Sequence, residues 1–105
     1  MKNITLSVQP FGNSKYRLGI KLDDSRTYFV KRHREVILKI EDQTINTKTT
    51  CGPPLNKGFD LSETAIHQWI IDNSFHKYIP RKPTKLIFKL DINNGLITLT
   101  YLNKE

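Results

Sequence analysis

Lysine and arginine side chains gather in three stretches of this sequence, and their chemistry is that of phosphate binding. Residues 31–34 read Lys-Arg-His-Arg, and residues 76–89 hold five lysine and arginine side chains and no acidic one. A third group surrounds Arg17, on a segment that alternates polar and apolar residues. Cationic side chains neutralise phosphates and release condensed counterions, so such binding weakens as salt is added. We therefore expect a polyanion-binding surface.

The candidate contact residues differ in what each can contribute. Arginine can read guanine through two parallel hydrogen bonds, whereas lysine acts as a point charge on the backbone. The ring of Tyr78 can stack on an unpaired base. Charged loops are also ordinary solvated surface, so each stretch has an explanation that needs no ligand. The residues expected to contact nucleic acid are Lys31, Arg32, His33, Arg34, Lys77, Tyr78, Arg81, Lys82, Lys85 and Arg17.

Groups that could carry out catalysis are few and isolated. Glu63 and His67 lie four residues apart, which on a helix lets two side chains share a metal, but two ligands make a weak site. Cys51 is the single cysteine, so no internal disulfide is possible, and no local signature pairs it with a histidine as a nucleophile. We expect a chain that is not an enzyme and that holds no metal and no cofactor.

Length and composition are those of one small globular domain. The chain has 105 residues, of which 37% are hydrophobic and 26% charged, so we expect a single domain over residues 1–105. Its formal net charge of +7 creates a field that attracts anionic partners. The sequence contains no apolar run that could span a bilayer, and its first residues lack the apolar centre of a signal peptide. We expect a cytoplasmic protein with no membrane partner.

Alternating hydrophobicity predicts strands over most of the chain. Turn residues at positions 10–14 predict a hairpin between residues 4–8 and 16–22, with one apolar face. Further strands are expected over residues 27–30, 36–40 and 45–49, and the last of these, rich in threonine and asparagine, is expected at a sheet edge. The expected pairs of the first hairpin are Val8 with Tyr16, Leu6 with Leu18, and Ile4 with Ile20.

The clearest local signal lies near the C-terminus. Asn94-Gly95 is typical of a two-residue hairpin turn, because a type I′ turn needs positive φ at both positions. One helix is predicted at about residues 61–72, beginning at Asp60 with Glu63 three residues on, and ending at Asn73 in a left-handed conformation. The turn pairs Ile92 with Ile97, Leu90 with Leu99, and Phe88 with Tyr101.

Together these elements predict a mainly β (α+β) fold, in which about seven antiparallel strands form a bent sheet or pseudo-barrel with the helix packed on it. The inventory resembles the pseudo-barrel of the B3 kind, which plant transcription factors and some restriction enzymes use to read DNA. The resemblance is one of architecture only, since no stretch of the sequence matches a B3 motif.

Charge and architecture favour one function over two alternatives. The first is a nucleic-acid-binding domain, for duplex DNA in preference to RNA, that holds the duplex with basic loops at one end of the barrel. Such a domain could be the recognition module of a restriction or regulatory system. The alternative is a protein-interaction module, such as a small phage or defence-related protein, that docks on an acidic partner or adds a strand at residues 45–50. A small enzyme ranks third.

Overall fold

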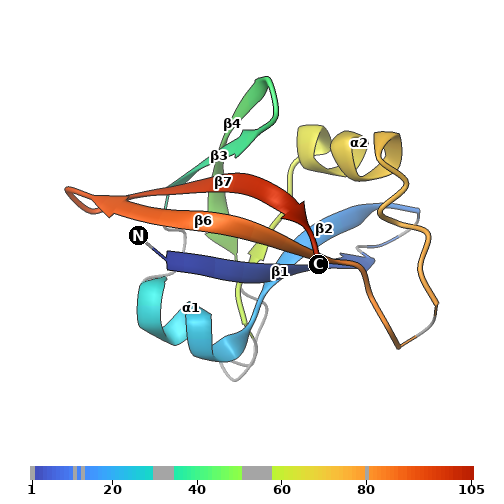
Figure 1. Cartoon of the computed structure of the whole chain (residues 1–105), viewed down its shortest axis with the longest axis horizontal. Helices are drawn as coiled ribbons and strands as arrows, with labels where there is room; N and C mark the ends of the chain where they lie inside the picture. Colours follow the sequence, from blue (N-terminus) through green and yellow to red (C-terminus); the bar gives the residue numbers. More distant parts are fainter. Residues whose placement is uncertain (1, 11, 13, 30–34, 51–57, 80) are drawn as a thin grey trace.

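A closed barrel of seven strands is built by the residues that the computed structural model describes, which are 2–10, 12, 14–29, 35–50, 58–79 and 81–105. The strands follow one another around the barrel in the order β1-β2-β5-β4-β3-β7-β6, and β6 pairs with β1 to close it (Figure 1). In sequence the elements are β1 Lys2–Pro10, β2 Tyr16–Ile20, α1 Leu22–Tyr28, β3 Glu35–Ile40, β4 Gln43–Thr50, β5 Asp60–Leu61, α2 Thr64–Asp72, β6 Lys85–Asn93 and β7 Leu96–Lys104.

The mainly β pseudo-barrel predicted from the sequence is confirmed, with two corrections. The described residues form two helices instead of one. The sheet is mixed, because β3 and β7 run parallel while the other pairs of neighbouring strands in the described part of the barrel are antiparallel. Neither helix of the described chain is long and apolar enough to cross a membrane.

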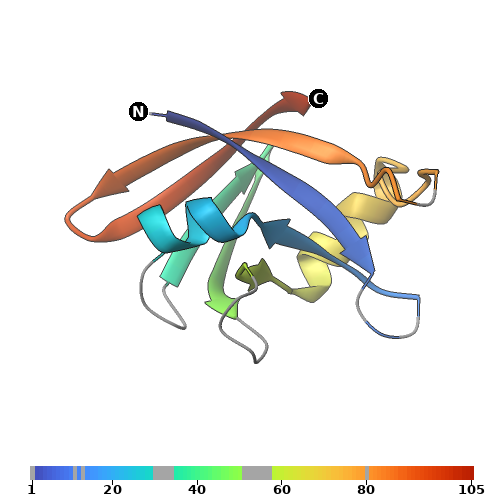
Figure 2. The same cartoon turned by 90° about the horizontal axis from the view of Figure 1, so that it is seen from below.

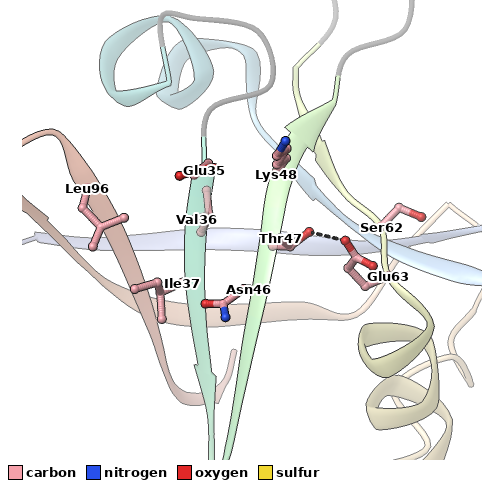
Figure 3. Close-up of a pocket in the computed structure, with 9 residues that line it drawn as sticks. All are labelled: Glu35, Val36, Ile37, Asn46, Thr47, Lys48, Ser62, Glu63 and Leu96. Atoms are coloured by element: carbon pink, nitrogen blue, oxygen red, sulfur yellow. Dashed lines mark hydrogen bonds between the residues drawn. The ribbon is translucent and has the colours of Figure 1, made fainter.

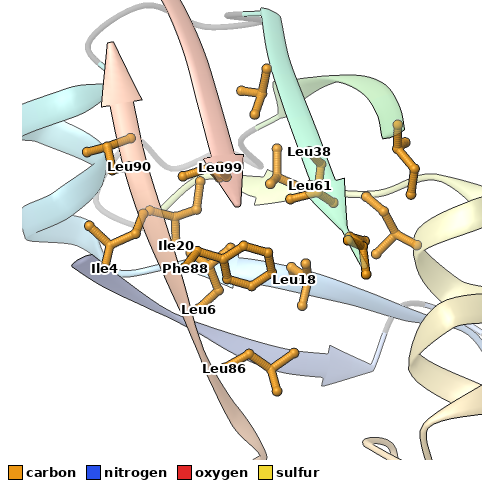
Figure 4. Close-up of a cluster of buried hydrophobic side chains, with 14 of the residues drawn as sticks. Ile4, Leu6, Leu18, Ile20, Leu38, Leu61, Leu86, Phe88, Leu90 and Leu99 are labelled. Atoms are coloured by element: carbon orange, nitrogen blue, oxygen red, sulfur yellow. The ribbon is translucent and has the colours of Figure 1, made fainter. Parts of the chain in front are cut away.

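The apolar residues of the alternating strands meet inside the barrel (Figure 4). Phe88 lies at the centre of this core and is fully buried, and Leu6, Leu18 and Leu99 around it are also fully buried. Burying one such side chain contributes about 1.5–3 kcal/mol, so the alternation itself drives barrel formation. Helix α2 adds its own stripe of Ile66, Trp69 and Ile70, as its spacing predicted.

The two hairpins test how well register follows from sequence. The three C-terminal pairs are confirmed, with Asn94 and Gly95 both at positive φ. The N-terminal register is wrong by two residues, since Val8 pairs with Leu18 and Leu6 with Ile20. Strand β1 continues to Pro10, so the connection is shorter than expected. A shift of two residues keeps every side chain on its face, which is why the same core forms.

Residues 27–30 were expected to be a strand, but Thr27 and Tyr28 belong to helix α1. Two acidic residues lie in the first turn of this helix, where the helix dipole favours them. The hydroxyl of the buried Ser25 donates to the Ile20 carbonyl and accepts from the backbone N–H of Phe59. Phe29, directly after the helix, is fully buried. These tertiary contacts stabilise a helix whose sequence has no apolar period.

Helix α2 starts three residues later than expected, because the chain first adds strand β5. Glu63 occupies the N-cap position, and Asp60 lies in β5 instead of capping the helix. Strand β5 is only two residues long, yet it joins β2 to β4 and so completes the ring. The helix ends at Asp72 as predicted, but Ser74 and not Asn73 takes the left-handed conformation.

Candidate nucleic-acid interface

A shallow depression of about 310 Å³ lies where β6 begins and β7 ends, and four lysines surround it. We call this depression the lysine hollow. The side chains of Lys77, Lys82, Lys85 and Lys104 are all exposed, so their ammonium groups face water. The full lining is Lys77, Tyr78, Ile79, Lys82, Pro83, Thr84, Lys85, Lys104 and Glu105.

Backbone hydrogen bonds fix the segments that carry these lysines. After α2 the chain turns back on itself, with the N–H of Lys77 donating to Ser74 at 3.1 Å. A second turn is closed by the N–H of Lys82, which donates to Ile79 at 2.9 Å. The N–H of Val8 then donates to the buried Thr84, which ties the end of this loop to β1. The hollow is therefore held by the barrel and does not depend on a free loop.

The fourth lysine, Lys104, comes from the end of β7, and the sequence-based prediction missed it. Lys104 lies opposite Leu86 because β7 carries one extra residue, Leu102, at a bulge between Ile87 and Phe88. The N–H of Glu105 donates to the carbonyl of Lys85 at 2.9 Å and extends this pairing. The hairpin turn at residues 94–95 was the signal that could have placed Lys104 near Lys85.

The charges around the hollow are not neutralised by neighbouring acids. Within the described part of the chain, the ion pair found within 4.0 Å joins Arg17 to Asp60, away from the hollow. Glu105 is the one acidic side chain among the residues that line it. Four ammonium groups against one side-chain carboxylate leave a local positive potential, which a bound anion would relieve.

Two other predicted contact residues flank the hollow. Tyr78 is half-buried and packs against the core, so part of its ring is covered. Burial, and secondarily the nearby phenol of Tyr16, raises the pKa of the Tyr78 phenol above its ordinary value. Arg81 is exposed in the turn between Ile79 and Lys82 and has a φ of 71°. Arg81 does not itself line the hollow, but it directly precedes Lys82, which does.

Of the remaining predicted contacts, the one that the structure describes, Arg17, does not line the hollow. Arg17 is half-buried on β2, where its Nη1 lies 3.3 Å from Asp60. Residues 31–34 lie outside the described residues. Their described neighbour Glu35 begins β3 close to the β6–β7 turn, because Val36 pairs with Ile97. That turn and the lysine hollow are at opposite ends of the hairpin (Figure 2).

Glu63 and His67, the two residues considered as metal ligands, each form a hydrogen bond to another part of the protein. Glu63 accepts a hydrogen bond from the Thr47 hydroxyl at 3.1 Å, and Nδ1 of His67 accepts one from the backbone N–H of Tyr16 at 3.1 Å. The Tyr16 ring also stacks on His67, with a centroid separation of 6.1 Å. Across the described ranges, His, Cys, Asp and Glu side chains form no group of three that could hold a metal ion. Cys51 lies outside those ranges.

The lysine hollow can attract and hold phosphates or carboxylates. Its lysines act as point charges, whereas the planar guanidinium of an arginine would be needed to read bases through two parallel hydrogen bonds. Comparison of the chain with protein-family models, with curated proteins and with solved structures finds no match.

Proposed function

We propose that this protein binds the phosphate backbone of nucleic acid, duplex DNA in first place, through the lysine hollow and the adjacent Arg81. The observation that carries the proposal is the convergence of four lysines from the 77–84 loop, the start of β6 and the end of β7 on one depression. Three of these four, Lys77, Lys82 and Lys85, were expected from the sequence alone. A net charge of +7 supports the proposal, because it steers a polyanion towards the molecule.

The residue types favour backbone contact over base reading. Lysine positions a duplex through its phosphates and carries little sequence information. The half-buried ring of Tyr78 offers little free face for stacking on an unpaired base, so single strands have no added advantage. We therefore expect duplex DNA of different sequences to bind alike. Such a domain would hold DNA for a restriction or regulatory assembly whose other parts supply catalysis or specificity.

Salt dependence tests the proposal quantitatively. Each neutralised phosphate contributes about −0.9 to the slope of log K against log salt, so the four lysines together with Arg81 predict a slope of about −4.5 on duplex DNA. Fluorescence anisotropy on a labelled duplex from about 50 to 200 mM salt would measure it, with single-stranded DNA and RNA in parallel. Lys82→Gln and Lys85→Gln should each flatten the slope by about 0.9, and Lys39→Gln on β3 is the matched control.

Two outcomes would refute nucleic-acid binding at this site. One is a flat salt response. The other is equal loss of affinity in Lys39→Gln and Lys85→Gln, because a diffuse effect of net charge would not need the hollow. Lys39 is exposed on a strand that does not border the hollow, so the two substitutions change the net charge equally and differ only in position.

A second candidate function is docking on an acidic protein surface. The observation that favours it is Ile79, whose side chain is 69% exposed on the rim of the hollow. An exposed aliphatic side chain adds nothing to phosphate binding but stabilises contact with a protein. Ile79→Ser should leave duplex affinity unchanged if DNA is the partner. A partner that is captured after nuclease treatment, and lost in Ile79→Ser, would favour the protein.

A further inference from the structure

Only the two-residue strand β5 closes the barrel between β2 and β4, so most of the β2 and β4 edges at this seam has no strand beside it among the described residues. Strand β5 pairs with β2 only at Leu18 and Gly19, and with β4 only at Thr49 and Thr50. The rest of each edge has no strand beside it in the described part of the fold. On the β2 side, His67 of helix α2 accepts the backbone N–H of Tyr16, so a side chain replaces the missing strand.

The β4 edge has no such replacement among the described residues. A two-residue turn, Glu41 and Asp42, makes Ile40 and Gln43 the first hydrogen-bonded pair of the β3–β4 hairpin. Hydrogen-bonded and non-hydrogen-bonded pairs then alternate, so the backbone groups of Thr44 and Asn46 point away from β3. Both residues are exposed. Two N–H and two C=O groups therefore face outward along one edge.

A groove of about 570 Å³ runs beside this edge (Figure 3). Asn46, Thr47 and Lys48 of β4 form one wall, and Ser62 and Glu63 at the start of α2 lie across from them. The Thr47 hydroxyl donates to the Glu63 carboxylate at 3.1 Å and fixes its position in the opposite wall. The groove continues over Glu35, Val36, Ile37 and Leu96.

We propose that an extended segment of a partner protein adds to β4 as an eighth strand at Thr44–Asn46, with a lysine or arginine facing Glu63. Strand addition would satisfy the outward backbone groups, which is the source of affinity in this mode of recognition. The charge of the groove selects the side chain. Glu35 and Glu63 outnumber Lys48, so this groove is acidic on a molecule whose net charge is +7. It therefore suits a basic segment, unlike the lysine hollow, and the proposal stands independently of nucleic-acid binding.

Hydrogen exchange on the free protein is the first test. Amide protons of Ile45 and Thr47, which face β3, should exchange slowly, whereas those of Thr44 and Asn46 should exchange at rates close to those of open chain. Slow exchange at all four positions would overturn the proposal, because it would show that the edge already has a partner.

Selection from a library of random peptides of about nine residues, which spans the edge at about 3.4 Å per residue, is the second test. Selected peptides should slow exchange at Thr44 and Asn46 and should carry lysine or arginine at one recurrent position. Asn46→Pro removes an outward N–H without touching the β3 ladder, so the protein should fold and lose the peptides. Asn46→Thr is the matched control that keeps the N–H, and it should bind as the natural chain does.

Glu63→Gln tests the side-chain preference. The substitution should weaken the binding of basic peptides by about two- to fivefold, which is the range of an exposed ion pair, and should leave the binding of uncharged variants of those peptides unchanged. Failure to select any peptide, binding that maps to the lysine hollow, or equal binding by Asn46→Pro and Asn46→Thr would each overturn strand addition.

Discussion

Arg81, next to Lys82 of the lysine hollow, has both a strained backbone conformation and a positive charge. A single substitution there should therefore raise the stability of the fold and weaken DNA binding at the same time. The φ of 71° at Arg81 is a left-handed conformation, and the N–H of Lys82 closes the turn onto Ile79 at 2.9 Å. Positive φ at the third position of a four-residue turn occurs in type II turns, which favour glycine there. An arginine in this conformation costs about 1 kcal/mol or somewhat more.

Arg81→Gly and Arg81→Ala separate the two effects. Both remove the charge, but only glycine relieves the strain. Glycine also increases the conformational entropy of the unfolded chain, which reduces the gain in folding stability by about 0.5–1 kcal/mol. Arg81→Gly should therefore stabilise the fold by about 0.5 kcal/mol, or about 2–4 °C in Tm, while Arg81→Ala stays close to the natural chain. Thermal unfolding followed by circular dichroism measures the difference.

Binding should respond to charge alone. Loss of one phosphate contact should reduce the slope of log K against log salt by about 0.9, and should weaken duplex affinity at about 0.1 M salt by up to about eightfold. Both variants should show the same loss. Unchanged binding would remove Arg81 from the interface. A lower Tm for Arg81→Gly than for Arg81→Ala would show that the turn is not strained.

Other positions give predictions that rest on single contacts. Gly58→Ala should destabilise the fold by about 3 kcal/mol or more, because an added Cβ would clash with the backbone of β2 at Ile20. Gly19→Ala should cost only about 1 kcal/mol, because its Cβ would meet the flexible side chain of Gln9. Urea unfolding of the two variants measures the difference. His67→Ala should cost about 1–2 kcal/mol by leaving the N–H of Tyr16 without its acceptor, and unchanged stability would contradict that hydrogen bond. Burial chiefly raises the pKa of the Tyr78 phenol above 10.0. The contribution of the neutral phenol to stability is therefore complete below pH 10 and is lost as the pH rises through the pKa of the folded state. Phenolate absorbance should show one tyrosine that titrates late, and Tyr78→Phe should remove it.

The parts of the fold that followed from sequence are those set by local rules. Asn94-Gly95 fixed both the turn and the register of the last hairpin, since a two-residue loop allows one pairing. The stripe of α2 followed from helical spacing in the same way. The bulge at Leu102 did not, because an extra residue in a strand has no local signature of its own.

The parts that did not follow depend on distant contacts. Helix α1 is stabilised by Ser25, whose hydroxyl forms hydrogen bonds with β2 and with Phe59. Residues 22–28 taken alone are a mostly polar segment with the β-branched Thr27 near its end, so nothing in them predicts a helix. Strand β5 exists because Asp60 and Leu61 reach β2 and β4 together. Two residues are too few to show a period, so only the closed barrel explains them.

The residues of the candidate site also differ in how far the sequence alone identifies them. Lys77, Lys82 and Lys85 could be identified from an acid-free run of sequence, and the structure brings them to one depression. Lys104 lies outside that run, and only the strand pairing that follows from the Asn94-Gly95 turn could have placed it near Lys85. The engagement of Arg17 by Asp60 could not be foreseen, since the two residues are 43 positions apart and meet only through the pairing of β2 with β5.

The lysine hollow and the β4 edge should act independently, and a double variant can show it. Strand β4 lies three strand spacings from β6 around the barrel, which is about 14 Å, and no described ion pair links the two surfaces. Substitutions that far apart with no shared partner add within about 0.5 kcal/mol. The combination of Lys85→Gln with Asn46→Pro should therefore show the duplex affinity of the first variant and the peptide affinity of the second. A larger coupling would mean that strand addition at the seam shifts β7 and the end that carries Lys104, so that a protein partner controls how firmly the hollow holds its anion.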